Sequence, residues 1–243
     1  MGRIWYGGAL LLTVLLAISW AGQLTGAERT ETVSAPAEGI KYVALTFDDG
    51  PSAVTEALLD GLKARSAKAT FFVLGCNIPG NESLLLRMAE EGHQIGQHTY
   101  SHVALESQSD ETLRRELGQT EALLTDLLGE GDYWLRPPYG LIQERQYALV
   151  ETPLITWTVD PEDWRLLDAA QVTQAVLSTV ESGDVILLHD IYESSVEAAL
   201  CIVDTLLSEG YRFLTLRELM EAEGVTPDAG ELYRSPTRPG RGW

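Results

Sequence analysis

The sequence predicts an α/β fold in which parallel strands alternate with helices, and two observations lead to this prediction. From about Ile40 onward, short runs of β-branched and aromatic residues alternate with longer stretches of helical periodicity, which is typical of βα units. Ionisable residues follow the apolar runs directly, where loops would leave the carboxyl edge of a parallel sheet. We therefore expect successive βα units arranged around a parallel sheet or a barrel.

The chain opens with an apolar segment. Ile4–Ala21 follows Arg3 and carries no charge. It is about as long as a membrane span, whereas the core of a cleaved signal peptide has roughly 7–15 residues. We predict that residues 1–27 are a signal peptide or a single N-terminal membrane anchor, and that residues 28–39 are a linker. The domain that follows is therefore expected outside the cytoplasm, either secreted or anchored.

Seven short apolar segments are the predicted strands. Most are rich in Val, Ile, Leu, Phe or Tyr and are bounded by polar or turn-forming residues. In chain order they are Tyr42–Phe47, Ala69–Leu74, Gln94–Gln97, Tyr133–Leu135, Leu154–Val159, Val185–Leu188 and Tyr211–Leu214. Seven such units are too few for an eight-unit barrel.

Helical periodicity fills the intervals between these strands. The last predicted helix starts after Thr215, because Thr215 and Glu218 have the spacing of a capping box. From Val225 onward, prolines and glycines replace the apolar residues, so we predict a folded domain over residues 40–224 and a flexible tail over 225–243. The predicted helices lie near residues 54–65, 82–91, 110–128, 142–149, 168–181, 194–209 and 216–223.

The composition indicates one globular domain and excludes several classes of partner. Hydrophobic residues make up 45% and charged residues 22% of the chain. The two cysteines, Cys76 and Cys201, are too few for a disulfide scaffold, and we do not expect them to form a required disulfide. A net charge of −19 repels the phosphates of nucleic acid and the head groups of anionic lipid. We expect a monomer without a nucleic-acid partner, which could attach to a membrane only through its apolar N-terminal segment.

Ionisable residues follow five of the predicted strands. Because the carboxyl ends of parallel strands meet at one edge of a sheet, we expect these side chains to share one rim. They belong to the segments Asp48–Asp49, His98–His102, Arg136–Tyr139, Asp160–Trp164 and His189–Asp190.

The histidines at these strand ends indicate a metal site. On one turn of helix, His98 and His102 would present both rings to the same side and could close on one metal ion, although this spacing is also typical of an exposed helical face. Asp48 and Asp49 can supply the third ligand; a plain Asp-Gly turn would leave the second carboxylate unexplained. The fourth histidine, His93, precedes its strand and is expected to pack or to sit in a turn.

The other charged residues at this rim have two interpretations. Arg136 and Asp163 could form a structural ion pair, or they could support catalysis. A phosphatase that uses a strand-end aspartate needs a second carboxylate two residues further on, and Gly50 occupies that position. The sequence therefore disfavours a phosphatase of this kind.

Five motifs occur in a specific order along the chain. They are TFDDGP (46–51), HTYSH (98–102), RPPY (136–139), DPEDW (160–164) and LLHD (187–190). This ordered set resembles the motifs of the polysaccharide deacetylase family, which is carbohydrate esterase family 4 with its NodB-homology domain. The resemblance covers roughly residues 40–220. Within the family, the sequence is similar to bacterial peptidoglycan N-acetylglucosamine deacetylases. It implies a distorted (β/α) barrel of about seven parallel strands.

The resemblance also implies a role for each motif residue. A divalent metal ion would be held by three ligands, with zinc favoured and cobalt, nickel or manganese as alternatives. The implied metal ligands are Asp49, His98 and His102. The implied base is Asp48 and the implied acid His189, with Arg136 orienting the base and Asp163 supporting both the arginine and the histidine. The backbone N–H of Tyr139 is the implied oxyanion donor, and the walls of the acetyl-methyl pocket are Trp164 and Leu187.

These implied roles lead to one expected activity. The chain is expected to be a metal-dependent hydrolase that removes N-acetyl groups from N-acetylglucosamine units of cell-wall glycan, with peptidoglycan as the leading substrate. The alternatives are an O-acetyl esterase acting on xylan and a deacetylase of chitooligosaccharides, because the motifs do not separate amides from esters. A non-catalytic glycan-binding module is disfavoured, since Asp48 and His189 are both present.

Overall fold

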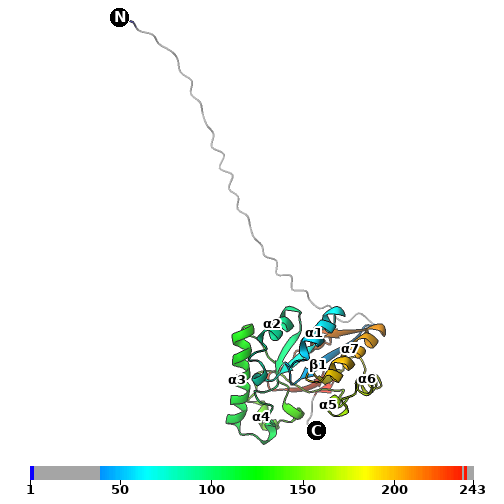
Figure 1. Ribbon diagram of the computed structural model, residues 1–243. Helices are drawn as coiled ribbons and strands as arrows, with labels where there is room; N and C mark the ends of the chain where they lie inside the picture. Colours follow the sequence, from blue (N-terminus) through cyan, green and yellow to red (C-terminus); the bar gives the residue numbers. More distant parts are fainter. Residues whose placement is uncertain (3–38, 237, 240–243) are drawn as a thin grey trace. The chain divides into compact units, whose positions relative to one another are not determined.

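The computed structural model describes residues 1–2, 39–236, 238 and 239 (Figure 1). The predicted signal peptide or anchor and almost all of the predicted linker therefore lie outside the described residues, so their assignment stays a prediction. Among the residues that are described, no helix combines the length and the apolar character needed to cross a membrane.

A parallel sheet organises the described part of the chain. Strand β1 (Lys41–Asp48) is central: it pairs with β6 (Tyr211–Leu214) along its first half, and with β2 (Thr70–Val73) and β5 (Val185–His189) along its second half. Strand β2 also pairs with β3 (Gln94–Gln97). All these pairings are parallel, so the carboxyl ends of the strands meet at one edge, as the sequence predicted.

Isolated parallel bridges close this sheet into a circuit. Gln97 bridges to Leu135, and Leu135 bridges to Leu154 at the start of β4 (Leu154–Ile155). Val159, four residues beyond β4, bridges to Ile186 in β5. The fold is thus a distorted (β/α) barrel, as the resemblance implied, with several of its strands reduced to one or two paired residues.

Two predicted strands are shorter than the sequence indicated. Of Tyr133–Leu135, only Leu135 makes a bridge, and the predicted strand Leu154–Val159 is split into β4 and the bridge at Val159. Within the second range the chain changes partners, because the backbone N–H of Thr156 donates to the carbonyl of Tyr233 and that of Thr158 donates to the carbonyl of Val185 in β5.

Helices follow the strands along the chain, mostly where periodicity predicted them. The capping box at the start of α8 is confirmed, since Thr215 and Glu218 each accept a hydrogen bond from the backbone N–H of the other. The predicted helix 142–149 is only the single turn α4, and α5 was not predicted. The helices are α1 (Thr55–Ala64), α2 (Glu82–Glu90), α3 (Asp110–Leu128), α4 (Glu144–Tyr147), α5 (Asp163–Leu166), α6 (Ala169–Leu177), α7 (Glu193–Ser208) and α8 (Leu216–Ala222).

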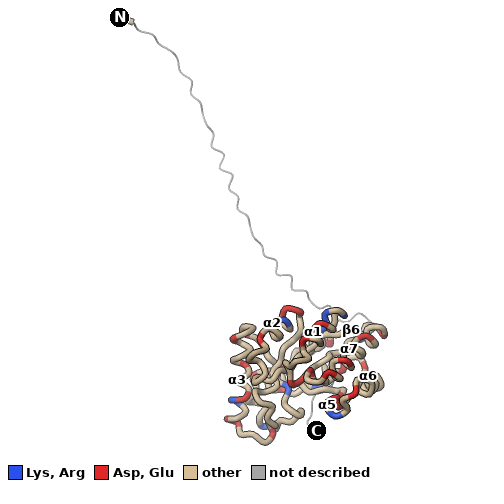
Figure 2. The backbone as a smooth tube through the Cα atoms, viewed as in Figure 1, with Lys and Arg blue, Asp and Glu red and all other residues tan. Residues whose placement is uncertain are grey.

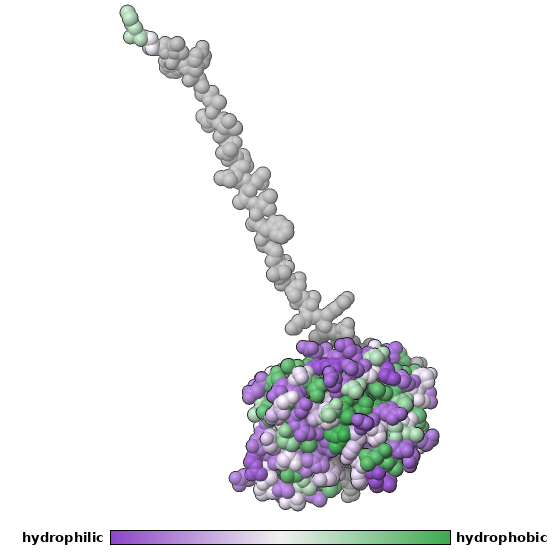
Figure 3. Space-filling model, in the orientation of Figure 1, coloured by the Kyte–Doolittle hydropathy of each residue, from purple (hydrophilic) through white to green (hydrophobic). Residues whose placement is uncertain are grey.

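The core lies between the sheet and these helices. Apolar side chains of α1 and α7, among them Leu58, Leu62, Ile202 and Val203, are fully buried against the central strands. Charged positions occur along several of the helices, with acidic positions prominent (Figure 2). Polar residues cover much of the face shown in Figure 3, with apolar side chains scattered between them. This amphipathic arrangement explains why helical periodicity was legible in the sequence.

The prediction of a flexible tail from residue 225 is wrong for part of that segment. Leu232–Ser235 form strand β7, which pairs in parallel with β4 and antiparallel with β8 (Arg238–Pro239). Leu232 is buried in a cluster that includes Leu135 and Leu154. The composition of this segment is poor in apolar residues and gives no sign that β4 would pair with its backbone. Because β7 forms this pairing, the folded domain extends beyond residue 224.

Candidate active site

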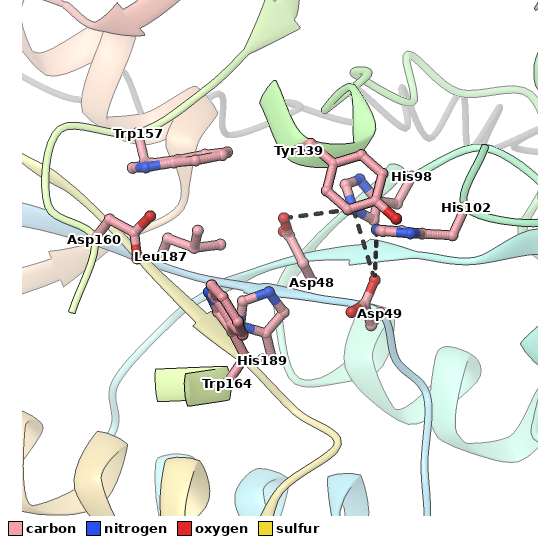
Figure 4. Close-up of a pocket in the computed structure, with 10 residues that line it drawn as sticks. All are labelled: Asp48, Asp49, His98, His102, Tyr139, Trp157, Asp160, Trp164, Leu187 and His189. Carbon is pink, nitrogen blue, oxygen red and sulfur yellow. Dashed lines mark ion pairs between the residues drawn. The ribbon is translucent and has the colours of Figure 1, made fainter. Parts of the chain in front are cut away.

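A pocket of about 390 Å³ opens at the carboxyl edge of the sheet (Figure 4). Eight of the ten residues predicted for the site line it, and the other two, Arg136 and Asp163, are fully buried. Trp157 and Asp160 complete the lining, and the sequence reasoning gave neither a role. Asp160 lies in the quoted DPEDW motif at a strand end, which is a signal that could have identified it; Trp157 lay inside a predicted strand and carried no such signal.

Asp49, His98 and His102 form one compact group. Oδ1 of Asp49 lies 3.3 Å from Nε2 of His102 and 3.6 Å from Nε2 of His98. The three ligand atoms all lie within 4.8 Å of one another. Oδ1 of Asp49 is buried and accepts no hydrogen bond within the described structure. A buried carboxylate oxygen facing two imidazole nitrogens is suited to a cation, so these residues fit a divalent metal ion.

A hydrogen bond on the other ring nitrogen orients His98 for metal binding. Its Nδ1 lies 2.6 Å from the carbonyl oxygen of Arg136, and a carbonyl can only accept, so Nδ1 carries the proton. Nε2 therefore keeps its lone pair toward Asp49. Burial lowers the pKa of His98 to about 3, so the ring is neutral and able to act as a ligand.

The helical interpretation of this histidine pair is wrong. His98 to His102 follow β3 as a loop, in which Thr99 and His102 have φ values of 67° and 58°. The two rings nevertheless converge, with centroids 5.0 Å apart. The conformation of the loop, and not the regular spacing of a helix, therefore brings the two rings together.

Asp48 lies beside this group and is paired with Arg136. Nη1 of Arg136 donates to Oδ1 of Asp48 at 2.8 Å and to Oγ1 of Thr46 at 2.7 Å, and Nη2 donates to the carbonyl oxygen of Thr156 at 3.0 Å. The guanidinium also stacks 4.2 Å above the ring of Phe72. Burial raises the pKa of Asp48, while the charge of Arg136 opposes that rise. The carboxylate is thus oriented by a cation that is itself fixed on several sides.

The alternative of an Arg136–Asp163 ion pair is wrong, because the ion-pair partner of Asp163 is His189. Oδ1 of Asp163 lies 2.7 Å from Nδ1 of His189, and Oδ2 accepts the backbone N–H of His189 at 2.8 Å. Ser195 of α7, which the sequence reasoning missed, donates its hydroxyl to Oδ2 at 2.5 Å. Burial by itself would lower the pKa of His189, but the hydrogen bond and charge of Asp163 outweigh it and raise the pKa to about 9.

Aromatic and apolar side chains form the pocket walls. Trp157 and Leu187 are buried, whereas Trp164 and Tyr139 are about half exposed at the mouth. Tyr139 has a left-handed φ of 61° within the turn Pro138–Gly140, and its ring meets the ring of His102 edge-on at 4.8 Å. The walls therefore combine an apolar floor with an aromatic rim (Figure 4).

Comparison with known proteins fixes the family. The sequence profile described as polysaccharide deacetylase matches residues 36–152. A peptidoglycan-N-acetylglucosamine deacetylase of Bacillus cereus is 39% identical over 187 residues, which span 74% of this chain and 68% of that protein. The chain belongs to the polysaccharide deacetylase family.

Other members of the polysaccharide deacetylase family agree in sequence and in structure. Peptidoglycan-N-acetylglucosamine deacetylase PgdA of Listeria monocytogenes is 40% identical over 180 residues, spanning 74% of this chain but only 39% of that protein. The structure of a family 4 acetyl xylan esterase from Clostridium thermocellum, in complex with a cobalt ion, is 34% identical with a TM-score of 0.76, over 80% of this chain and 98% of that one. The distorted barrel of this chain is thus the fold of its family.

Proposed function

We propose that this protein is a metal-dependent deacetylase that removes N-acetyl groups from N-acetylglucosamine units of cell-wall glycan, with peptidoglycan as the leading substrate. The observation that carries this proposal is the arrangement of one pocket: a three-residue ligand set, an oriented carboxylate and a histidine with a raised pKa all face the same space. An amide is hard to cleave because it needs a nucleophile, stabilisation of the developing oxyanion and a proton for the leaving amine. The pocket holds a group for each requirement.

Asp49, His98 and His102 would hold the metal ion. Two imidazoles and one carboxylate leave coordination positions open, as in catalytic zinc sites, which favours zinc; cobalt, nickel or manganese accept similar donors. When bound, a divalent ion of this kind supplies a Lewis acid that activates water and polarises the acetyl carbonyl. The cobalt ion in the structure of the related esterase supports the binding of a divalent metal ion by this chain.

Asp48 acts as the base. Its Oδ1 is held by Arg136, and its Oδ2 lies 3.6 Å from Nε2 of His98, so the carboxylate borders the ligand set. From this position it accepts the proton of the attacking water. Arg136 fixes the direction of the carboxylate, and its charge opposes the rise in pKa that burial causes.

His189 acts as the acid. The amine of the sugar leaves poorly as an anion, so a proton must reach the nitrogen as the C–N bond breaks. With a pKa of about 9, His189 is protonated near neutral pH, and Asp163 holds Nδ1 so that Nε2 is left for the substrate. The raised pKa thus follows from the same contact that orients the ring.

The remaining predicted roles concern the acetyl group itself. Tyr139 lies in a turn and lines the pocket, and its backbone N–H would donate to the oxyanion that forms at the acetyl carbonyl. Trp164 and Leu187 would enclose the methyl group, since both line the pocket with apolar surface. These two contacts would select an acetyl group over larger acyl groups.

The place of action follows from the substrate and from the N-terminal sequence. Relatives named as peptidoglycan deacetylases support a cell-wall substrate, and Ile4–Ala21 would export or anchor the domain. The protein would act as a monomer outside the cytoplasm. The related acetyl xylan esterase favours O-acetylated xylan as the second candidate substrate.

Mass spectrometry of the products distinguishes these substrates. Peptidoglycan fragments, chitooligosaccharides and acetylxylan are incubated in parallel with the zinc-loaded protein, and loss of one acetyl group lowers the product mass by about 42 Da for each reaction. The Asp48→Asn variant is the matched control, because it keeps the size and position of the side chain but cannot act as a base. Release from acetylxylan alone would contradict the N-deacetylase proposal, and release from none of the three would contradict a deacetylase altogether.

A further inference from the structure

The loop that carries both histidine ligands has an unusual backbone. Thr99 and His102 both have φ values in the left-handed region, at 67° and 58°, and neither is glycine. L side chains disfavour this region, so such residues persist only where the surroundings hold them. The position of His102 relative to His98 therefore depends on contacts outside the loop.

One side of the loop is held through its carbonyl groups. The short 3-10 helix η1 (Gly75–Asn77) donates the N–H of Gly75 to the carbonyl of Thr99 at 3.0 Å and the N–H of Cys76 to the carbonyl of Tyr100 at 2.9 Å. Asn77 of the same turn donates its side-chain amide to the carbonyl of Asp49 at 2.8 Å. The turn after β2 thus contacts the segments that carry all three ligands.

Glu116 of α3 holds the loop through its amide groups. Its Oε2 accepts the backbone N–H of Ser101 at 2.8 Å and that of Tyr100 at 3.1 Å. The hydroxyl of Ser101 lies 3.0 Å from each carboxylate oxygen. Glu116 is 5% exposed, so this carboxylate is buried and directed at the loop from the inner face of the helix. None of the five sequence motifs contains this residue.

We propose that Glu116 is a positioning residue of the metal site. By fixing two consecutive amides between His98 and His102, it holds the loop in the conformation in which both Nε2 atoms face Asp49. Without these bonds the left-handed residues would relax, and His102, which is the less buried of the two histidines, would leave the ligand set most readily. The inference rests on the proposed metal site but not on the choice of substrate.

Two substitutions separate geometry from charge. In Glu116→Gln, the amide oxygen can replace Oε2 and accept both N–H groups, while the amide nitrogen can donate to the hydroxyl of Ser101. Both backbone bonds are kept, the bond between Oε1 and the Ser101 hydroxyl reverses its direction, and the charge is lost. In Glu116→Leu, all of these bonds are lost. Glu121→Leu is the matched control, because Glu121 lies on the same helix and is exposed. Glu116→Asp withdraws the carboxylate by one methylene and replaces the Leu variant should that variant not fold.

The readout is the zinc dissociation constant of the 243-residue chain, measured by competition with a chelator, together with thermal unfolding of the metal-free protein. We expect Glu116→Leu to weaken zinc binding by about 10- to 100-fold, the range typical of contacts that orient metal ligands. The same loss is expected of Glu116→Asp if it has to replace the Leu variant. Glu116→Gln and Glu121→Leu should bind zinc as the unmodified chain does. Unchanged affinity in a folded Leu or Asp variant would overturn the proposal, and so would equal losses in the Gln and Leu variants, since charge and not loop geometry would then decide. If the variants bind zinc as expected but the unmodified chain deacetylates no substrate, the proposed function is contradicted and this inference stands.

Discussion

Replacing Asp163 by Asn tests the acid role of His189, because it removes a charge without changing the size of the side chain. Oδ2 of Asp163 accepts the backbone N–H of His189, which cannot turn around, so the amide oxygen must take this position. The amide nitrogen then replaces Oδ1 and donates to Nδ1 of His189. A ring nitrogen that accepts a hydrogen bond carries no proton, so the substitution favours the neutral imidazole.

The size of the effect follows from the pKa of His189. Burial lowers this pKa, and the bond to Asp163 raises it to about 9; without that bond we take the ordinary value of 6.5 as the reference. Near pH 8 the protonated fraction would then fall from about nine tenths to about one thirtieth, which predicts a loss of about 30-fold in the rate of amide cleavage. Near pH 6 both forms are largely protonated, and the loss from this cause is below about twofold.

The assay follows acetate release from a small N-acetylated oligosaccharide across this pH range. Ser195→Ala is the matched control, because it removes one hydrogen bond to Asp163 but leaves the charge in place. We expect the alkaline limb of the rate profile to move to lower pH in Asp163→Asn and to stay nearly in place in Ser195→Ala. An equal loss at pH 6 and pH 8 would refute the reasoning, since Asp163 would then support the fold and not the proton on His189.

Other residues yield further predictions. His98→Ala should abolish zinc binding, measured by elemental analysis, and undiminished metal would remove these residues from the ligand set. Asp48→Asn should keep the metal yet lose at least about a hundredfold in turnover, because its amide cannot accept a proton; near-normal turnover would exclude it as the base. The pKa of His93 is lowered by burial to about 4, below its ordinary 6.5, so the folded state binds fewer protons than the unfolded state in this window. Stability should therefore fall as pH decreases from 6.5 to 4, by up to about 3 kcal/mol, and this part of the decrease should be absent from His93→Asn in urea titrations. Leu232→Ala should cost about 2–3 kcal/mol of unfolding free energy in the same assay, whereas no change would mean that β7 contributes nothing to the fold.

The sequence determined where the chemistry lies. Strand-forming runs and the polar residues after them are local patterns, and parallel strands bring their carboxyl ends to one edge whatever the details of their pairing. Asp48, His98 and His189 could therefore be assigned to a common rim from these patterns alone, and all three line the pocket. The capping box of α8 was predictable for the same reason, because all of its atoms lie within four residues.

Tertiary structure alone decided which of these residues act on one another. Arg136 could have paired with either of two aspartates, and it pairs with Asp48 because the circuit of strands places its guanidinium next to the end of β1. Glu116 contacts the histidine loop from α3, where the structure buries it. The local sequence of the helix does not indicate this contact. Leu232 is ordered by the backbone of β4, nearly eighty residues earlier in the chain. Such contacts join residues far apart in sequence, and their formation depends on the packing of the whole barrel, which no local pattern records.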